Sequence, residues 1–562
     1  MKKTIYFLFI LLFLSSCDDG FLDREPLDSF GSESVFKDPA LTQAYLYNLQ
    51  GRLPYGINGS TGYGSYSDML ASATDEARGK SGWVEVNAVI IKGAITPTRS
   101  GGLDLWEAAY KNIRIANEII KGLEASEMNK SDKNAYIAQA KYVRAFEYWD
   151  LVRRYGDVPL IKVPQNFEDD ILVSRTPSSE VYAFIYSELN EAAQYLPNKS
   201  EVEAGVINKQ AAISLNARAM LYSKQWQKAA ELADKVIAGA ENDGIDLHPN
   251  YRELFLSHHG NNEVIMEKIT NIPNTGHSFA RYNFPVRWRS DWGGQTNPTQ
   301  QMVDAYEMAT TGLPISDPLS GYNPDRPYDG RDKRFYASIF YHGSEFSEVQ
   351  PIRGLPFIDM EWNNQNEGPG TKKDGNASIT GYLVKKFADP ADGFGPKPEE
   401  SQASWKEIRF AEVLLIYAEG ANEANGPSAK VYASINKVRA RAGLPNLPEG
   451  LSKEQMRERI RQERRVELAF ENHRWFDLIR WGMAEEVLNG FVPRGVKITR
   501  KDNAPSHDEK PQLFDQDYLD FDTSFIVEGR TQTFPSSHNL LPIPQSEMDK
   551  NPNLAPQNPG YN

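Results

Sequence analysis

Paired helical segments joined by short turns constrain the fold of this chain more than any other feature. Residues 104–123 and 134–161 each carry apolar residues at the helical period, and a polar break separates them. A second hairpin spans residues 208–239, with alanines where its two helices would cross and Trp226 at its turn. A unit of about 34 residues with small residues at the crossing is typical of tetratricopeptide-like repeats.

Two further pairs near the C-terminus extend the pattern. Residues 409–444 form one pair, and residues 454–482 form another that keeps apolar residues on one helical face from Val466 to His473. The fold class is therefore expected to be mostly α, an α-solenoid of four tetratricopeptide-like helical hairpins.

Long tracts rich in Gly, Pro, Asn and aromatic residues separate these hairpins. They span residues 242–298, 312–404 and 490–562. Loops of this length in a compact protein are usually functional or inserted. We expect the solenoid to be a scaffold and the tracts to form a loop-rich, irregular lobe that carries the binding site.

The start of the chain has the form of a secretory signal. A basic Met1-Lys2-Lys3 precedes an apolar run from Ile5 to Leu14, which is too short to cross a membrane. Cys17, the only cysteine, directly follows Leu-Ser-Ser, so the segment resembles a bacterial lipobox. That resemblance implies cleavage before Cys17, diacylglycerol on its sulfur and a fatty acid on its amine. An ordinary signal peptide with an incidental cysteine is the alternative.

These observations give the expected division of the chain. Residues 1–16 are a lipoprotein signal peptide, residues 17–240 an N-terminal region and residues 241–562 a C-terminal region, the last two packed as one globular unit. The formal net charge of −14 becomes −16 when Lys2 and Lys3 leave with the signal. Such a charge disfavours nucleic acid and anionic lipid as partners.

Catalytic constellations are not evident in the sequence. A glycosidase needs two carboxylates at a set separation, one of them with a raised pKa, and Asp75-Glu76 is the best local pair. Neighbours in sequence diverge in direction, so a loop hydrogen-bonding role is favoured for this pair. His258 and His259 are adjacent, and no zinc-binding helix motif accompanies them. We therefore expect no enzyme activity and no cofactor.

Several motifs together resemble the SusD/RagB family of Bacteroidetes outer-membrane lipoproteins. They are YVRAFEYWDLVRRYGDVPLI, IRFAEVLLIYAEGANEA, INKVRARAGL, RIRQERRVELAFENHRWFDLIRWG and LLPIPQSEMDKNPNLAPQNPGY, together with DDGFLDREPLD after Cys17. The resemblance implies a lipid-anchored, cell-surface protein of the outer membrane that captures oligosaccharides and delivers them to a SusC-like TonB-dependent transporter. Asp18 and Asp19 resemble that family's acidic export tag. Peptide binding, as in the RagB branch, is the alternative, and a surface glycoside hydrolase is a weaker one.

A sugar site needs an aromatic platform with flanking amides, carboxylates or Arg. Three irregular segments combine these residue types. One of them lies just ahead of the helix expected at residues 104–123, and the resemblance places part of a glycan site in that segment. The candidate ligand-binding residues are Asp75, Trp83, Asn87, Tyr282, Arg287, Trp288, Trp292 and Trp362. Trp288 and Trp292 are the preferred stacking platforms, since two tryptophans so close in a loop with several Arg are hard to bury together.

Charged residues in the C-terminal helical motif are expected to be structural. Arg464 can pair with Glu467, and Glu471 with Arg474, each three residues further on. Arg144 interrupts an apolar stripe, so we expect it to bind loop carbonyls or a carboxylate in the core.

Overall fold

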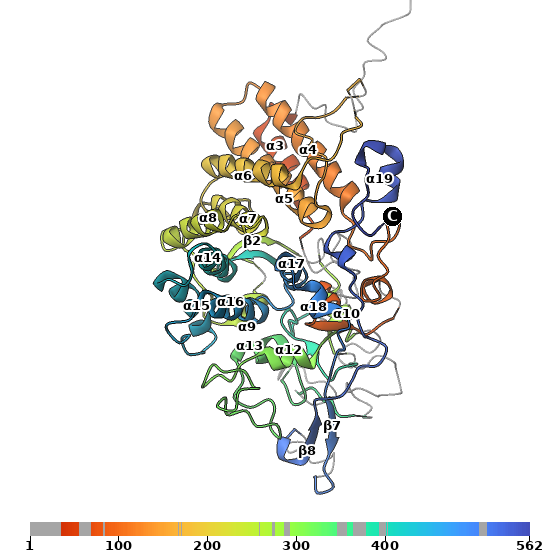
Figure 1. Ribbon diagram of the computed structural model, residues 1–562. Coiled ribbons are helices and arrows are strands. Elements are labelled where there is room, and N and C mark those ends of the chain that lie inside the picture. The colour runs from red at the N-terminus through yellow and green to blue at the C-terminus, as the bar shows by residue number, and fades with distance from the viewer. Residues whose placement is uncertain are drawn as a thin grey trace, which may run out of the picture.

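Stacked helices form one half of the protein in the computed structural model, and the shorter elements and loops lie below and beside them (Figure 1). The structure describes residues 35–55, 69–82, 85–166, 168–169, 171–257, 259–271, 276–285, 293–345, 357–362, 378–392, 401, 403–504 and 514–561. The predicted signal peptide and Cys17 lie outside these residues.

The helical stack follows chain order, because each helix packs on the next. Its members are α3 (Pro39–Gly51), α4 (Trp106–Ala125), α5 (Lys130–Tyr155), α6 (Ser178–Tyr195), α7 (Lys209–Tyr222), α8 (Trp226–Gly239), α14 (Phe410–Asn425), α15 (Ala429–Arg441) and α16 (Lys453–Glu467). Helix α8 packs directly on α14, although 170 residues lie between Gly239 and Phe410. The predicted mostly helical, tetratricopeptide-like fold is confirmed. The boundary at residue 240 is not tested by this packing and stays a prediction.

Local chemistry explains where the long helix α5 begins and ends. The side chain of Asn129 accepts the backbone N–H of Asp132 and satisfies one of the free donors of the first turn. Gly156 ends the helix at φ +71°, a conformation that glycine adopts without strain. Arg144 lies midway along α5, where its guanidinium binds Glu188, Asn117 and the carbonyl of Lys162. The prediction for Arg144 is therefore confirmed.

Close approach of backbones joins the two parts of the stack. A Cβ atom added at Gly420 of α14 would lie 2.9 Å from the carbonyl oxygen of Trp226 and 3.1 Å from the backbone nitrogen of Ala230, both on α8. Only a residue without a side chain allows these helices to pack so closely.

The second lobe consists of short helices and two-stranded sheets. Its helices are α9 (Tyr251–Leu256), α10 (Phe279–Asn283), α12 (Gln300–Ala305), α13 (Lys333–Ser338), α17 (Arg474–Arg480), α18 (Ala484–Leu488) and α19 (Gln545–Lys550). Its antiparallel strand pairs are β1 (Ala77–Gly79) with β3 (Thr296–Pro298), β2 (Val264–Lys268) with β6 (Trp405–Arg409), β4 (Ile339–Phe340) with β5 (Leu383–Val384), and β7 (Lys497–Arg500) with β8 (Leu519–Asp522). Single turns of tighter or wider helix complete the set at Leu70–Ala73, Val86–Ile90, Lys199–Glu201, Gln516–Tyr518, Ser536–Asn539 and Pro552–Leu554. The predicted loop-rich tracts thus contain most of this lobe.

A buried ion network fixes the lobe to the stack. Arg409, at the end of β6, binds the carboxylates of Glu263, Glu467 and Glu471 at 2.6–2.8 Å. All of these side chains are almost completely excluded from solvent, so removal of one partner would leave an uncompensated buried charge. The network therefore holds a strand, a helix and a turn in one register.

The two local ion pairs expected in the C-terminal motif are wrong. Arg464 binds Asp477 rather than Glu467, and Arg474 binds Asp75 rather than Glu471. Each charge instead finds a partner from another element, because burial makes a fully paired core arrangement necessary.

The expected single helical face from Val466 to His473 is also wrong. Helix α16 ends at Glu467, and α17 begins at Arg474. Between them Phe470 and Asn472 adopt φ values of +64° and +65°, which a right-handed helix excludes. The carbonyls freed by this break accept side-chain donors, as when the hydroxyl of Tyr251 donates to Glu467 O at 2.7 Å.

Candidate functional site

Short hydrogen bonds bring together the chain segments that flank the predicted binding loops. Strand β1 pairs with β3, the backbone nitrogen of Lys80 donates to Gln295 O at 2.8 Å, and Ser81 Oγ donates to Gln295 Oε1 at 2.7 Å. From a third segment, Ile379 N donates to Asn297 Oδ1 at 3.1 Å. We call residues 80–82, 293–297 and 378–380 the loop junction.

The loop between Pro285 and Gly293 starts and ends at this junction. Gly294 N donates to Phe284 O at 3.0 Å, and Gln295 N donates to Tyr282 O at 2.9 Å. These two bonds close the base of the loop in which the sequence placed Arg287, Trp288 and Trp292. Those three residues, like Trp83 of the neighbouring loop, lie outside the described residues, so their roles stay predictions.

Tyr282 and Trp362 are the predicted aromatic residues that the structure describes. Tyr282 is half-buried at the base of the loop, with the guanidinium of Arg281 5.7 Å from its ring centre. Trp362 is also half-buried, meets the ring of Phe525 edge to face at 5.2 Å, and has Lys497 Nζ 4.8 Å from its ring centre. Both keep part of their surface available to a ligand.

Strand β7, to which Trp362 is hydrogen-bonded, connects Trp362 to the loop junction. Trp362 N donates to Ile498 O, and two residues earlier Val496 N donates to Thr380 O, both at 2.8 Å. The described parts of the three predicted binding segments therefore lie next to β1, β3 and β7.

Asp75 occupies a different position from the one expected. Its side chain is only 4% exposed, and its carboxylate accepts from Arg474 and Arg465 at 2.8 Å. Burial opposes the charged form, but the two guanidiniums outweigh it and hold the pKa of Asp75 well below its usual range. Asp75 therefore has a structural role in the core next to β1. We correct its assignment from a ligand contact to a scaffold residue.

Glu76 is equally buried and does not form a catalytic pair with Asp75 at a surface. Burial, and then the charge of Asp75, raise the pKa of Glu76 to about 8, and the backbone N–H of Phe470 points at its carboxylate at 3.4 Å. A substrate bond cannot reach two carboxyls enclosed in the core. The pair that the sequence offered for glycosidase chemistry is thus structural.

Asn87 supports the loop that carries Trp83. Its side chain is 1% exposed, and its Nδ2 donates to the carbonyl of Ser81 at 2.7 Å. Asn87 therefore holds one end of the junction in place, a positioning role rather than the predicted direct contact.

Sequence reasoning missed the side chains that build the junction. Gln295 and Asn297 receive or make most of its bonds, yet they lie in an unremarkable polar run after Gly293-Gly294. The only signal in the sequence was the polar run Gln295-Thr296-Asn297 directly after two glycines.

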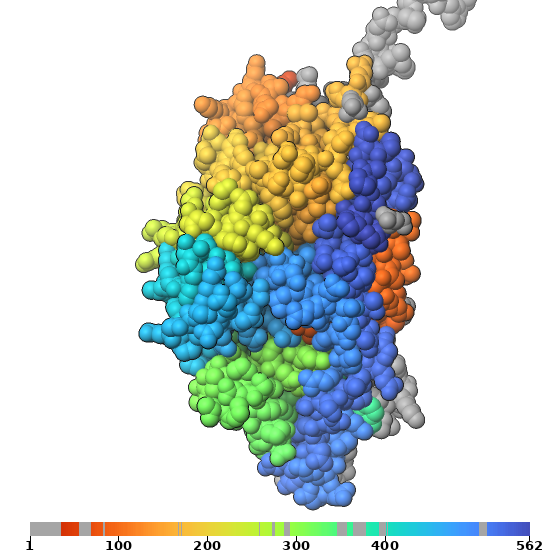
Figure 2. All heavy atoms as spheres, in the orientation of Figure 1, coloured from red at the N-terminus to blue at the C-terminus, as the bar shows by residue number. Residues whose placement is uncertain are grey.

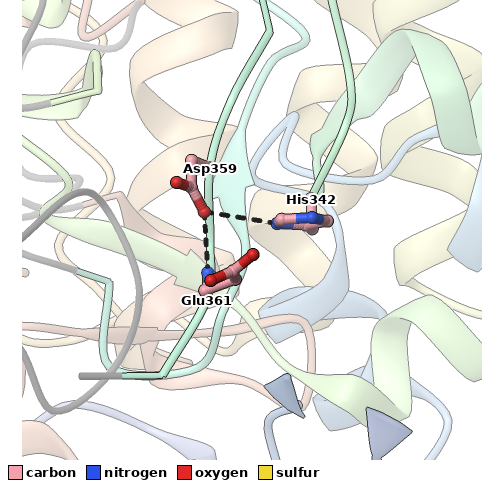
Figure 3. Close-up of side chains that lie close together, drawn as sticks. All are labelled: His342, Asp359 and Glu361. Atoms are coloured by element: carbon pink, nitrogen blue, oxygen red, sulfur yellow. Dashed lines mark hydrogen bonds and ion pairs between the residues drawn. The ribbon is translucent and has the colours of Figure 1, made fainter. Parts of the chain in front are cut away.

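One group of side chains in the described parts of the chain has the composition of a metal site: His342, Asp359 and Glu361, whose ligand atoms lie within 4.8 Å of one another (Figure 3). His342 Nδ1 accepts the backbone N–H of Met360 at 3.1 Å, and Arg500 lies 2.7 Å from the carboxylate of Glu361. The Glu361 carboxylate is therefore already ion-paired within the protein. The group is best described as a buried hydrogen-bonded cluster.

Within its described residues, the protein has no helix both long and apolar enough to cross a membrane.

Fold and site together define a class: a tetratricopeptide-like helical scaffold that presents a loop-rich lobe. Comparison with known proteins makes the class specific. Residues 262–561 match the family model of the SusD family, and residues 21–221 match a model described as "Starch-binding associating with outer membrane". The chain belongs to the SusD/RagB family, as its motifs predicted.

Individual relatives align along the whole chain. SusD-like protein P2 of Formosa agariphila is 28% identical over 592 residues and is covered completely, as is this chain. A SusD-like protein of Bacteroides ovatus is 24% identical, with 98% of this chain and 97% of the relative covered.

Solved structures share the fold. A SusD-like protein from Bacteroides fragilis superimposes with a TM-score of 0.77 at 26% identity, covering 96% of this chain and 100% of that one. A structure described as a laminarin binding SusD-like protein gives a TM-score of 0.65 at 23% identity, covering 93% and 99%.

Proposed function

We propose that this protein is a non-catalytic, cell-surface glycan-binding lipoprotein of the outer membrane. It captures oligosaccharides at the loop junction and delivers them to a SusC-like TonB-dependent transporter. The observation that carries the proposal is that the segments flanking the Trp83 and Trp288 loops meet at β1 and β3, and that residues 378–380 link this junction to β7 and Trp362, in a chain of the SusD/RagB family. The family description that refers to starch and the relative that binds laminarin support the glycan class.

The chemistry of the junction suits a sugar. A pyranose ring presents an apolar C–H face that stacks on an aromatic ring, and a rim of hydroxyls that needs donors and acceptors. Tyr282 and Trp362 are two stacking surfaces, and Trp83, Trp288 and Trp292 are proposed as further ones. Arg287 is proposed to donate to ligand oxygens.

Attachment to the membrane is proposed through the N-terminus. Cys17 carries the lipid, and residues 18–34 connect it to Val35, the first described residue, which lies just before the helical stack. Asp18 and Asp19 direct export to the outer leaflet. The loop junction would then face substrates outside the cell, above the transporter.

Affinity electrophoresis through gels containing laminarin or soluble starch tests the proposal. Wild-type protein should be retarded in at least one gel. Trp362→Ala and Trp288→Ala should weaken binding about three- to tenfold each, the loss expected for one aromatic contact. Tyr47→Ala is the matched control, because Tyr47 is an exposed aromatic residue on α3 at 48%.

Three results would overturn the proposal. Retardation that survives in Trp362→Ala, Trp288→Ala and Trp292→Ala alike would remove the loop junction as the site. Release of reducing ends from either polysaccharide by the purified protein would replace capture with hydrolysis. Binding of a peptide library in place of every glycan would favour the RagB-like alternative.

A further inference from the structure

A concave site lies where the helical stack meets the C-terminal segment. It is a cleft of about 500 Å³, within the range of small-molecule sites. Its walls come from the end of α5, the start of α6, the end of α7, helix α17 and residues 539–559. In Figure 2 the yellow helices, the blue segment that includes α17 and the dark-blue C-terminal segment meet on one face. We call it the tail cleft.

The walls of the tail cleft combine apolar and polar groups. Val152, Phe476, Ile479 and Leu540 supply apolar surface, and Pro556 and Pro559 add the edge of the C-terminal segment. All the lining residues belong to described parts of the chain. An amphipathic cleft of this kind suits a ligand that has both C–H and hydroxyl surface.

Two tyrosine hydroxyls in the cleft have no hydrogen-bond partner among the described residues. Tyr182 on α6 and Tyr222 on α7 both line it, and within the described residues neither hydroxyl donates or accepts a hydrogen bond. Burial raises the pKa of each phenol, so both stay protonated and can donate. Both residues are half-buried where they line the cleft, so their hydroxyls are available to bond a ligand there.

The charges that line the cleft are paired within the protein, and Arg480 binds Glu419 and Asp477. Arg153 is ion-paired with Asp150 and lies between the rings of Trp149 and Phe476, 3.8 Å and 3.9 Å from their centres. At the rim, Arg175 donates to the carbonyls of Asp157 and Pro556, so it fixes the C-terminal segment to the stack.

The carboxylate of Asp157 accepts the backbone N–H of Ser178 at 2.7 Å and offsets the charge of Arg175. No strong net charge therefore selects an ionic ligand, and an uncharged, hydroxyl-rich one is favoured.

We infer that the tail cleft is a second saccharide-binding site, separate from the loop junction, which takes one neutral sugar ring and bonds its hydroxyls through Tyr182 and Tyr222. The apolar wall of Val152, Phe476 and Leu540 covers the C–H face of the ring. The inference does not depend on the loop junction being a glycan site.

Saturation-transfer NMR with neutral monosaccharides tests this inference. The probes are glucose, galactose, mannose, xylose and N-acetylglucosamine, with glucuronate as the charged comparison. At least one neutral sugar should give a signal with the full mature protein. The double variant Tyr182→Phe/Tyr222→Phe should bind that sugar about tenfold more weakly, the loss expected for two neutral hydrogen bonds.

Matched variants separate the two sites. Tyr195→Phe removes a hydroxyl from the same helix outside the cleft, where the residue is 46% exposed, and should bind as wild type does. A neutral sugar should still give a signal with Trp362→Ala, which alters the loop junction, and that remaining signal is the one that the double variant should weaken. The Tyr→Phe changes break no hydrogen bond between described residues, so the melting temperature of each variant should equal that of wild type.

Three outcomes would overturn the inference. They are the absence of a signal from every neutral sugar, a signal that the double variant retains at full strength, and a signal that Trp362→Ala abolishes.

Discussion

Asp75 and Arg474 are joined by two parallel hydrogen bonds, Arg474 Nε to Asp75 Oδ1 and Nη2 to Oδ2, both 2.8 Å long, across a sequence separation of 399 residues. Arg465 adds a third contact to the same carboxylate at 2.8 Å. The pairing joins the strand that starts the loop junction to the helix that follows the break at residues 468–473. The core beneath the candidate site is therefore built from two segments that lie 399 residues apart in the sequence.

Removal of the Asp75 charge should destabilise the fold. Asp75→Asn would leave Arg465 and Arg474 buried without their carboxylate, and breaking such a pair costs about 3–5 kcal/mol. Urea unfolding followed by circular dichroism measures the change in the free energy of unfolding. Glu107→Gln, at an exposed pair with Lys111, is the control and should unfold as wild type does. A variant as stable as wild type would show that Asp75 is not part of the scaffold.

Glu147 should make stability depend on pH. It is 1% exposed, and Asn112 Nδ2 donates to its carboxyl at 2.7 Å. Burial raises its pKa to about 8 from the ordinary 4.5. Between these values the native state holds one proton more than the unfolded state, so the stabilisation is complete below pH 4.5. As the pH rises from 4.5 to 8 it falls by about 1.4 kcal/mol per pH unit, and above pH 8 it is lost.

Glu147→Gln keeps the acceptor for Asn112 and removes the titration. Its free energy of unfolding should therefore fall less than that of wild type between pH 5.5 and 8.5 in a urea series. Glu107→Gln should follow the wild-type slope, since that carboxyl is exposed. Parallel pH curves for wild type and Glu147→Gln would contradict the raised pKa.

Periodicity predicted the helical half of the fold but not all of its members. The stripe in residues 104–123 and the alanines of residues 208–239 identify α4, α7 and α8, because local apolar spacing alone determines those faces. Helix α6 was not expected. Its stripe of Val181, Ile185 and Leu189 is interleaved with aromatic residues, which obscure the helical period.

The site was harder to predict, because its connections are long-range. Asp75 was predicted as a ligand contact because of its polar loop context. No residue near it in the sequence indicates that Arg474 is its partner. The break after Glu467 was missed for the same reason, since the free carbonyls of Glu467 and Ala469 accept from Tyr251, Arg409 and Lys386 of distant segments. Burial of charge is decided by the tertiary structure and leaves no local pattern.

Gly420 should be intolerant of any side chain. A Cβ atom there would meet backbone atoms of α8 at 2.9 Å and 3.1 Å, and a helix backbone cannot move aside as a flexible side chain can. Gly420→Ala should therefore lower the free energy of unfolding by about 1–3 kcal/mol, despite the higher helix propensity of alanine.

The matched control is Gly51→Ala at the end of α3, where an added Cβ meets nothing within 4 Å. That change should be neutral or slightly stabilising in the same urea experiment, because alanine costs less backbone entropy in a helix. Equal stability of the two variants would contradict the close packing of α8 on α14.

Cys17 should determine where the protein is found in the cell. If it carries the lipid, Cys17→Ala should abolish incorporation of a labelled fatty acid and move the protein from the membrane fraction to the soluble fraction. One acyl chain binds a bilayer only marginally, whereas several chains on one residue hold it stably. Ser32→Ala, in the same N-terminal segment, is the control and should remain labelled and membrane-bound. Labelling and membrane retention that persist in Cys17→Ala would refute lipidation at this residue, because the chain contains no other cysteine.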